Sequence, residues 1–245
     1  MENYKIQEVE HGKNIAANAE MIWGWGTPAG LSRAERRADY LISMATVKPG
    51  KKILEVGCGT GIYTEKLAKT DADIIAIDIS PDLLAQARDK IKSPKVSFLE
   101  SDLENLPFSD ENFDAVVGVS ILYHVNVIMA LKEIRRVLKP GGSIVFSEPN
   151  MLNPQVALER NIPFIRKALY NSPEETAFLR WRLAKLITDA RFSEISIRPF
   201  DFLHPLTPKP LIKIVEYLGI IIEHIPILRE FAGSLLITAW RISNF

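Results

Sequence analysis

Between residues 52 and 149 the sequence alternates short apolar runs with helical patterns. The apolar runs, which read as strands, are KILEVG, DIIAID, KVSFLES, FDAVVGVS and SIVFSEP. The helical patterns between them are IYTEKLAKT, PDLLAQARDKI and IMALKEIRRVL. Strands joined through helices need crossover connections, which are right-handed and leave the strands parallel. The alternation therefore predicts an α/β fold with a doubly wound, mostly parallel sheet and helices on both faces.

The segments on either side of this core follow other patterns. Residues 1–48 contain a short helical stretch near 13–22, the loop WGWGTPAG, and a helix that Ser32 would cap, with Glu35 three residues later. After Pro149 a proline-rich stretch precedes the amphipathic helix EETAFLRWRLAKLITDARF and the strands SEISIRPFDFL and GSLLITAWRI. We predict one domain over residues 1–245. Its parts are a helical cap (1–48), a core (49–150) and two insertions (151–172 and 203–230).

Composition excludes several classes of function. Lys plus Arg and Asp plus Glu number 30 each, and this balance argues against a nucleic-acid partner, which favours a basic excess. The chain has one cysteine, Cys58, so it forms no intramolecular disulfide. With the polar start MENYKIQEVEHGKN, which is unlike a secretion signal, this predicts a cytoplasmic protein. The histidines are scattered and no cluster has metal-ligand spacing, so we expect no metal.

The glycine loop EVGCGTG, residues 55–61, follows the first strand. Its pattern is G-x-G-x-G, and Ile62 stands where a dinucleotide site has its third glycine. No G-K-[ST] follows, which excludes a phosphate-binding P-loop. Asp78 ends the next strand, where a carboxylate accepts hydrogen bonds from ribose hydroxyls. A ribose occurs in both NAD and S-adenosyl compounds, so Asp78 does not identify the cofactor. The alternative to a ribose contact is that Asp78 only caps the next helix.

Four segments in order carry a resemblance to a known family. They are ILEVGCGTG, AIDIS, SDLENLPFSDENFDAVV and ALKEIRRVLKPGGSIVFSEP. Together they resemble the class I S-adenosylmethionine-dependent methyltransferases, most closely the type 11 group that contains quinone-biosynthesis and other small-molecule enzymes. The resemblance covers roughly residues 50–150 and the helix–strand pattern around 174–199. It implies a Rossmann-like, seven-stranded sheet with an antiparallel last strand, S-adenosylmethionine as cofactor, and methyl transfer to a small molecule by in-line displacement.

The resemblance also implies which residues contact the cofactor. The glycine loop and Val119 would hold the methionine end, Asp78 the ribose, and the remaining positions the adenine. The full set is Glu55, Gly57, Cys58, Gly59, Asp78, Ile79, Asp102, Leu103 and Val119. The alternatives are that Ile79 and Leu103 are ordinary core residues, that Asp102 is a turn residue, and that Cys58 is a small filler.

No general base follows from the sequence, because a sulfonium already activates the methyl group. His124, in SILYHV after the fourth strand, is our candidate base. Capping the next helix or lining the cofactor pocket are the alternatives for His124, and they apply to Tyr123 as well. SILY also stands where methyltransferases acting on DNA bases carry an N/D-P-P-Y/F motif, which further disfavours a nucleic-acid substrate.

Two features point to the acceptor side. The resemblance implies that Trp23 and Trp25 lie over the carboxyl edge, where they would cover the cofactor or stack on an acceptor. Trp25 could also contact the sulfonium through a cation–π interaction, and packing under a loop is the alternative for both. Relatives build the acceptor pocket from insertions such as 151–172 and 203–230.

The segment 211–228 is very apolar, but its charged residues and Pro226 argue against a membrane-spanning helix. It can be a lid, a dimer face in a homodimer, or a peripheral contact with a membrane. We expect it to pack against 150–170 and to select an acceptor with a hydrophobic portion. The sequence leaves open whether the protein is a monomer or a homodimer. The rival functions are a non-catalytic cofactor-binding protein and a nicotinamide-dependent oxidoreductase.

Overall fold

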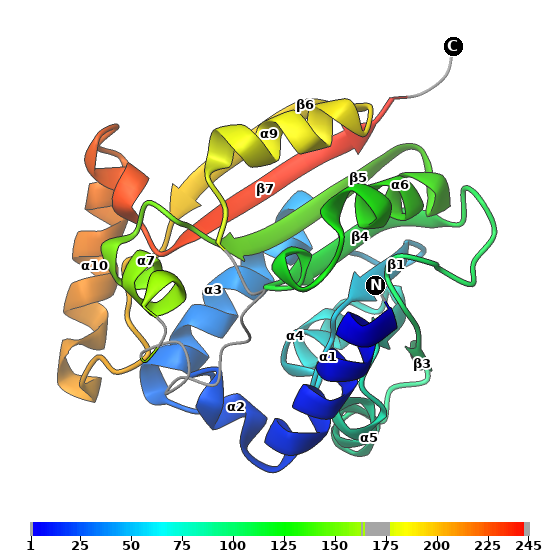
Figure 1. Ribbon diagram of the computed structural model, residues 1–245, viewed down its shortest axis with the longest axis horizontal. Coiled ribbons are helices and arrows are strands. Elements are labelled where there is room, and N and C mark those ends of the chain that lie inside the picture. The colour runs from blue at the N-terminus through cyan, green and yellow to red at the C-terminus, as the bar shows by residue number, and fades with distance from the viewer. Residues whose placement is uncertain (1, 163, 165–176, 243–245) are drawn as a thin grey trace.

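The computed structural model describes residues 2–162, 164 and 177–242, and its centre is one seven-stranded sheet (Figure 1). The strand order is β3-β2-β1-β4-β5-β7-β6, and only β7 runs antiparallel to its neighbours. This confirms the predicted fold, including the antiparallel last strand. The strands are β1 (Lys52–Val56), β2 (Asp73–Asp78), β3 (Val96–Glu100), β4 (Phe113–Val119), β5 (Leu138–Pro149), β6 (Phe192–Phe200) and β7 (Ser234–Arg241).

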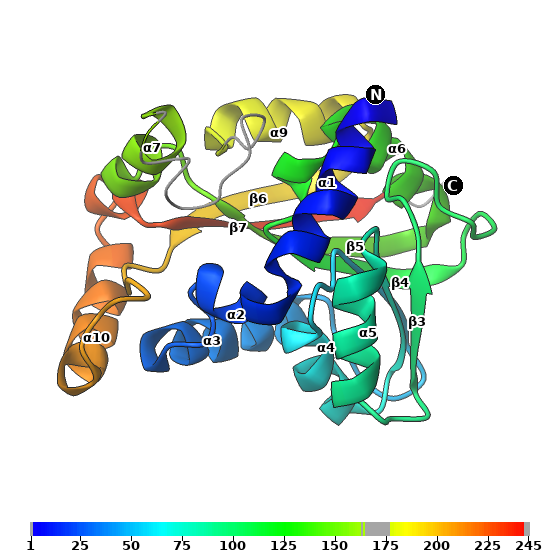
Figure 2. The same cartoon turned by 60° about the horizontal axis from the view of Figure 1, so that its bottom comes forward.

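Helices cover both faces of this sheet, as Figure 2 shows. Leu131 and Ile134 of α6 and Leu183 of α9 are buried in one core cluster, on one face. Leu41 of α3 and Leu67 of α4 are buried in a second cluster, on the other face. The helices of these layers are α3 (Pro28–Met44), α4 (Ile62–Leu67), α5 (Pro81–Lys90), α6 (Val127–Val137) and α9 (Arg180–Asp189).

The sheet has its topological switch point between β1 and β4. From β1 the chain winds outward through β2 and β3, and it then returns to β4 on the other side of β1. In open α/β sheets the loops diverge at this point, and ligands bind outside the carboxyl ends of the strands there. The fold therefore directs attention to the loops that follow β1, β2, β4 and β5.

The N-terminal cap differs in detail from the expectation. Helix α1 (Glu2–Ile15) starts far earlier than the stretch near 13–22, and α2 (Ala19–Ile22) follows it. Helix α3 begins at Pro28, because the Thr27 hydroxyl accepts a hydrogen bond from Gly30 N (3.0 Å), so the prediction that Ser32 caps this helix is wrong. Proline at the first helical position was the signal for this start.

The second insertion packs differently from our expectation. Its helix α10 (Ile212–Glu223) buries Ile212 against Ala29 of α3 and Leu203, rather than against the described part of 150–170. That part, with α7 (Pro154–Asn161), attaches instead to residues 230–232, through hydrogen bonds from the Asn150 and Asn153 side chains. The remainder of 150–170 lies outside the described residues.

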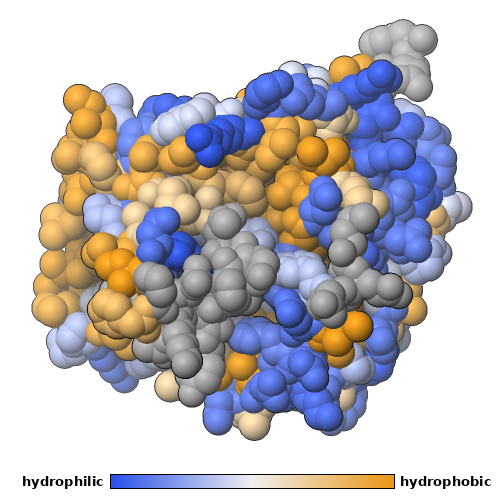
Figure 3. Space-filling view, in the orientation of Figure 1, coloured by the Kyte–Doolittle hydropathy of each residue, from blue (hydrophilic) through white to orange (hydrophobic). Residues whose placement is uncertain are grey.

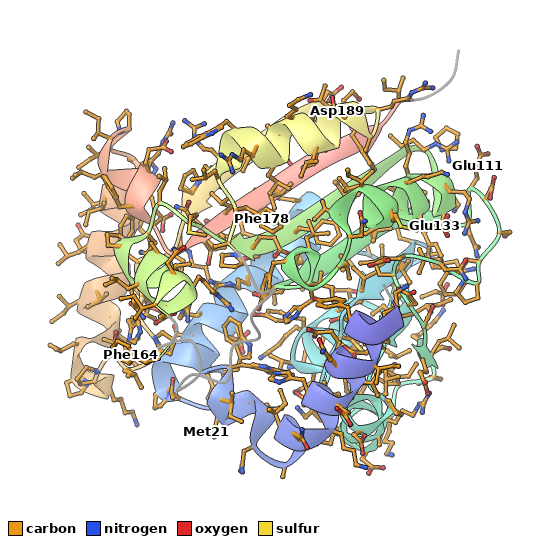
Figure 4. The ribbon with its side chains drawn as sticks, in the orientation of Figure 1. Met21, Glu111, Glu133, Phe164, Phe178 and Asp189 are labelled. Atoms are coloured by element: carbon orange, nitrogen blue, oxygen red, sulfur yellow. The ribbon has the colours of Figure 1, made fainter. Side chains whose placement is uncertain are left out.

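Helix α9 begins at Arg180, later than the pattern from residue 174 suggested. Before α9, Phe178 lies in an extended segment beyond the end of β5 (Figure 4). The Phe178 carbonyl accepts a hydrogen bond from Met151 N (3.0 Å). Residues 174–176 are outside the described part. None of the described helices is long and apolar enough to cross a membrane.

Candidate active site

A cavity of about 740 Å³ opens at the carboxyl ends of the strands. Its floor is formed by the loops after β1, β2, β3 and β4, and α1 and α3 contribute to its walls. Helix α7 and the segment 201–206 close the end over β5, β7 and β6. Met21 of α2, labelled in Figure 4, lies at the rim, where 60% of it is exposed.

The glycine loop forms the part of this floor after β1. Gly57, Gly59 and Gly61 all have positive φ angles, of 67°, 53° and 82°, a region that residues with a Cβ avoid. A Cβ on Gly57 would lie 2.6 Å from Ile121 Cδ1. Between these glycines, Cys58 is buried, and burial raises the pKa of its thiol well above the usual value. A neutral, enclosed thiol fits the reading of Cys58 as a filler.

Asp78 lies beside this loop at the end of β2. Its Oδ2 accepts a hydrogen bond from Gly59 N (2.8 Å), and its Oδ1 accepts one from Ser80 N (2.9 Å). A carboxylate offers about four lone-pair positions, so Asp78 keeps acceptor capacity toward the cavity, which it lines together with Ile79. The cap of α5 is Ser80, whose hydroxyl accepts from Leu83 N, so Asp78 is not needed as a cap.

Helix α1 crosses this edge and closes the site over β3. Lys5 is ion-paired with Asp102, and its Nζ lies 3.4 Å from Glu104 Oε2. Asp102 Oδ1 also accepts from Glu104 N (2.8 Å), while Leu103 between them is 5% exposed and lines the cavity. Gly12 permits the close approach of α1, because a Cβ there would lie 2.5 Å from Ser80 Oγ.

Two buried carboxyl groups support the strand ends. Glu55 at the end of β1 is 2% exposed, burial raises its pKa to about 8, and its Oε2 has no hydrogen-bond partner in the described part of the chain. Glu55 is not among the residues that line the cavity. Glu148 of β5 accepts from Ile121 N and Leu122 N, both at 3.0 Å, and burial raises its pKa to about 7. Glu148 thus fixes the turn after β4, where Val119 lines the cavity.

That turn, η3 (Leu122–His124), carries His124, which lines the cavity. His124 Nδ1 lies 3.1 Å from Glu8 Oε2, and its carbonyl accepts from the Tyr4 hydroxyl (2.6 Å). Burial opposes ionisation of Glu8, but the hydrogen bond and charge of His124, together with His11 and Tyr4, outweigh it and hold the pKa of Glu8 below its usual value. Asn126 caps α6, so the reading of His124 as that cap is wrong.

The predicted aromatic residues divide between the two ends of the cavity. Trp23 covers the glycine loop, with its ring 3.2 Å from where a Cβ on Gly59 would be. The guanidinium groups of Arg33 and Arg37 instead lie over the Trp25 ring, with their Cζ atoms 5.4 and 5.2 Å from its centroid. Tyr123 lies against His124 (ring centroids 4.1 Å apart). The structure therefore places Trp23, and not Trp25, over the glycine loop.

The arginines under Trp25 belong to a cluster that the sequence did not reveal. Arg33 Nε and Arg37 Nη1 both contact Asp201 Oδ2, at 2.9 and 2.7 Å. Burial opposes ionisation of Asp201, but the charges of Arg37 and Arg33 outweigh it and lower its pKa to about 2. Among the described residues, no group of His, Cys and carboxylate side chains could hold a metal ion.

Comparison with known proteins decides the family. A family model described as a methyltransferase domain matches residues 54–146. The demethylmenaquinone methyltransferase of Paenarthrobacter aurescens is 31% identical over 188 residues, which cover 69% of this chain and 72% of that protein. The chain belongs to the class I S-adenosylmethionine-dependent methyltransferases.

Solved structures of methyltransferases share the fold of this one. A Thermotoga maritima S-adenosylmethionine-dependent methyltransferase superposes with a TM-score of 0.66 at 20% identity, covering 94% of this chain and 99% of that one. Phosphoethanolamine N-methyltransferase 2 of Haemonchus contortus, solved with S-adenosylmethionine, gives 0.63 at 15% identity, covering 90% and 56%. These structures show the shared fold. Because the chain belongs to the S-adenosylmethionine-dependent family, its cofactor is S-adenosylmethionine, and the prediction of a nicotinamide-dependent oxidoreductase is not supported.

Proposed function

We propose that this methyltransferase methylates a small molecule with an apolar portion, of the quinone type. The observation that carries the proposal is one cavity shared by the glycine loop and an apolar wall. The wall consists of Val156, Phe202, Leu203, Pro205 and Leu206. Relatives named for demethylmenaquinone support a quinone as the acceptor. An apolar acceptor bound there would lie in the same cavity as the methyl donor.

The walls of the cavity fit S-adenosylmethionine. The loop that carries Gly57, Cys58 and Gly59 would bind its methionine end, together with the backbone at Val119, and Asp78 would accept from the ribose hydroxyls. Ile79, Asp102 and Leu103, which line the cavity, would surround the adenine, while Glu55 would act from beneath the loop. When bound, the cofactor supplies an electrophilic methyl group on its sulfonium. The chain's part is to position the acceptor and to exclude water.

His124 would receive a proton where the acceptor has one to lose. Its Nδ1 lies 3.1 Å from Glu8 Oε2, and this contact holds the ring in place. Tyr123, stacked on His124, forms the adjoining surface of the cavity. Because Glu8 belongs to α1, closure of this helix and orientation of His124 are coupled.

We also propose that α10 contacts a lipid surface, which is where a quinone would be found. Ile214, Tyr217, Leu218 and Ile221 of this helix are exposed, which favours a surface contact over a buried lid. Figure 3 shows apolar residues gathered along the edge of the molecule that α10 forms. The alternative is that this face is buried in a homodimer. Sedimentation with and without vesicles distinguishes a lipid contact from a dimer interface.

The test of the function is turnover of S-adenosylmethionine with reduced demethylmenaquinone in detergent. We expect S-adenosylhomocysteine and an acceptor heavier by one methylene unit, both detected by mass spectrometry. Calorimetry with S-adenosylhomocysteine is run first, because it reports the cofactor site alone. Tight binding of S-adenosylhomocysteine without methylation of demethylmenaquinone or of other apolar acceptors would contradict the proposal and favour the non-catalytic scaffold.

A further inference from the structure

The inner face of α10 supports one wall of the cavity. Ile212 packs in a buried cluster with Leu203, and Glu223 Oε1 accepts a hydrogen bond from Asp201 N (2.8 Å). The segment 201–203 that these contacts hold lines the cavity. The outer face of α10 is therefore separated from the proposed acceptor wall by the thickness of one helix.

The outer face of α10 is apolar and exposed. Its large exposed side chains, which recur at the spacing of one helix face, are Ile214, Tyr217, Leu218 and Ile221. Figure 2 shows α10 at one end of the molecule, next to α3. Leu206 and Leu211, in the segment that leads into α10, are exposed as well, and Leu206 also lines the cavity. Exposed apolar side chains thus extend from α10 to the opening of the cavity.

Two lysines border this apolar face. Lys213 lies at the flank of the helix, one turn before Tyr217, and Lys209 lies in η4 (Lys209–Leu211), directly before α10. Both lysines are exposed, and neither forms an ion pair with a described residue. Lysines at the edge of an apolar helix face are typical of helices that lie in a bilayer interface, because their ammonium groups reach the lipid headgroups.

The carboxylates of α10 are turned away from these lysines. Glu223 accepts two hydrogen bonds from the Arg36 guanidinium, at 2.8 and 2.6 Å. Glu216 accepts from the hydroxyl of Ser32, which also belongs to α3. Lys plus Arg and Asp plus Glu number 30 each in the whole chain, so the positive charge beside the outer face is a local feature.

This combination of charge and apolar surface fits an anionic lipid bilayer better than a second copy of the chain. In a two-fold dimer the face would meet itself, so lysines would be brought toward lysines without an opposing carboxylate of α10. A bilayer with anionic headgroups offers the opposite charge to the lysines and hydrocarbon to the apolar side chains.

We infer that the outer face of α10 docks on an anionic lipid bilayer with Lys209 and Lys213 at the headgroups, and that the apolar acceptor enters the cavity from the bilayer beside Leu206. This inference rests on the proposed function and adds to it the charge of the bilayer and the orientation of the enzyme. Because the inner face of α10 holds the segment 201–203, docking places the acceptor wall next to the bilayer surface.

The experiment measures co-sedimentation of the full-length protein, saturated with S-adenosylhomocysteine, with two kinds of vesicle. One kind contains phosphatidylcholine alone, and the other contains equal parts of phosphatidylcholine and phosphatidylglycerol. We expect binding to be about tenfold tighter, or more, with phosphatidylglycerol, because each lysine near an anionic surface adds attraction. Added salt should reduce this preference, since it screens exposed charges. Equal affinity for the two vesicles at low salt would overturn the inference.

The double variant Lys209→Gln, Lys213→Gln should lose about tenfold of its affinity for vesicles with phosphatidylglycerol, and little of its affinity for phosphatidylcholine alone. The matched control is Lys92→Gln with Lys95→Gln. It removes the same charge from two exposed lysines between α5 and β3, at the opposite end of the molecule from α10 (Figure 2). An unchanged preference in the double variant, or an equal loss in the control, would overturn the inference.

Turnover separates this inference from the proposed function. With reduced demethylmenaquinone in vesicles that contain phosphatidylglycerol, the double variant should methylate more slowly than the unmodified protein, whereas the two rates should agree in detergent. Equal rates in the vesicles would overturn the entry of the acceptor from the bilayer. No methylation in detergent by the unmodified protein would instead overturn the proposed function, while the vesicle affinities still decide the inference. A dimer that binds neither vesicle would make the outer face of α10 a subunit interface and overturn the inference.

Discussion

The two ends of the cavity are formed by different parts of the residues: backbone groups and short side chains at one end, and long side chains at the other. At the cofactor end, backbone groups and short carboxylates from successive strand ends meet, as Gly59 and Asp78 do. At the other end, over β5, β7 and β6, which is the proposed acceptor end, long side chains from α3 reach across to Asp201 and Ser234. Backbone positions are fixed by the sheet, whereas long side chains can be exchanged one at a time. A fold of this kind can therefore change its acceptor while it keeps its cofactor.

The substitution with the largest expected effect lies in the glycine loop. Gly57→Ala adds a Cβ at a φ of 67° and within 2.6 Å of Ile121. We expect the free energy of unfolding to fall by about 2–5 kcal/mol, and S-adenosylhomocysteine binding to be lost with it. Chemical denaturation and calorimetry measure the two effects.

Gly50→Ala is the matched control for this substitution. Gly50 has a φ of 80°, but a Cβ there would meet no atom within 4 Å. It should therefore show only the backbone strain, about 1 kcal/mol, with normal cofactor binding. Equal losses in the two variants would show that the contact with Ile121 does not matter.

A pH series tests the carboxyl groups beneath the two ends. Burial raises the folded-state pKa of Glu55 to about 8 and of Glu148 to about 7, from 4.5. Folding thus favours the protonated forms of Glu55 and Glu148. Their contribution to the free energy of unfolding is fully present below pH 4.5 and disappears as the pH rises through 7 to 8. The free energy of unfolding should fall by on the order of 3 kcal/mol between pH 5 and 8.

Asp201 at the acceptor end titrates with the opposite sign. Its pKa is lowered to about 2, so its contribution is present above the usual value of 3.8 and is lost only as the pH falls toward 2. Glu148→Gln should therefore reduce the fall in stability between pH 5 and 7 to the part that Glu55 contributes, because Asp201 contributes no slope there. A profile that rises with pH across this range would refute the assignment of protonated Glu55 and Glu148.

The third test concerns the ribose site. Asp78→Ala should weaken S-adenosylhomocysteine binding by about 1–3 kcal/mol, because hydrogen bonds to a charged group are lost. Asp73→Ala, at the exposed start of the same strand, removes only an ion pair with Lys95 and should leave the affinity unchanged. Unchanged affinity in Asp78→Ala, measured by calorimetry, would remove Asp78 from this role.

The sequence was sufficient to bring the residues around the glycine loop together, because they are close to one another in the chain. Gly59 and Asp78 bond across 19 residues, within one strand–helix–strand unit whose periodicity is visible. Arg33 and Asp201 are 168 residues apart, and nothing in either neighbourhood indicates the other. Helix α1 was missed for a different reason. It lies over a cavity instead of a core, so it lacks the apolar stripe that identifies a helix. The sequence also offered a signal that our prediction did not use: Glu148 is an acidic residue within an apolar strand.

The smallest expected effect on stability lies at α10, outside both ends of the cavity. Leu218 is 50% exposed, so Leu218→Ser should change the free energy of unfolding by no more than about 0.5 kcal/mol. Ile212 of the same helix is 7% exposed, and Ile212→Ser should cost about 2–4 kcal/mol. If α10 contacts lipid, Leu218→Ser reduces co-sedimentation with phosphatidylglycerol vesicles while methylation of a detergent-solubilised acceptor is kept. If the variant instead changes a dimer to a monomer and binds vesicles as before, the exposed face of α10 is a subunit interface.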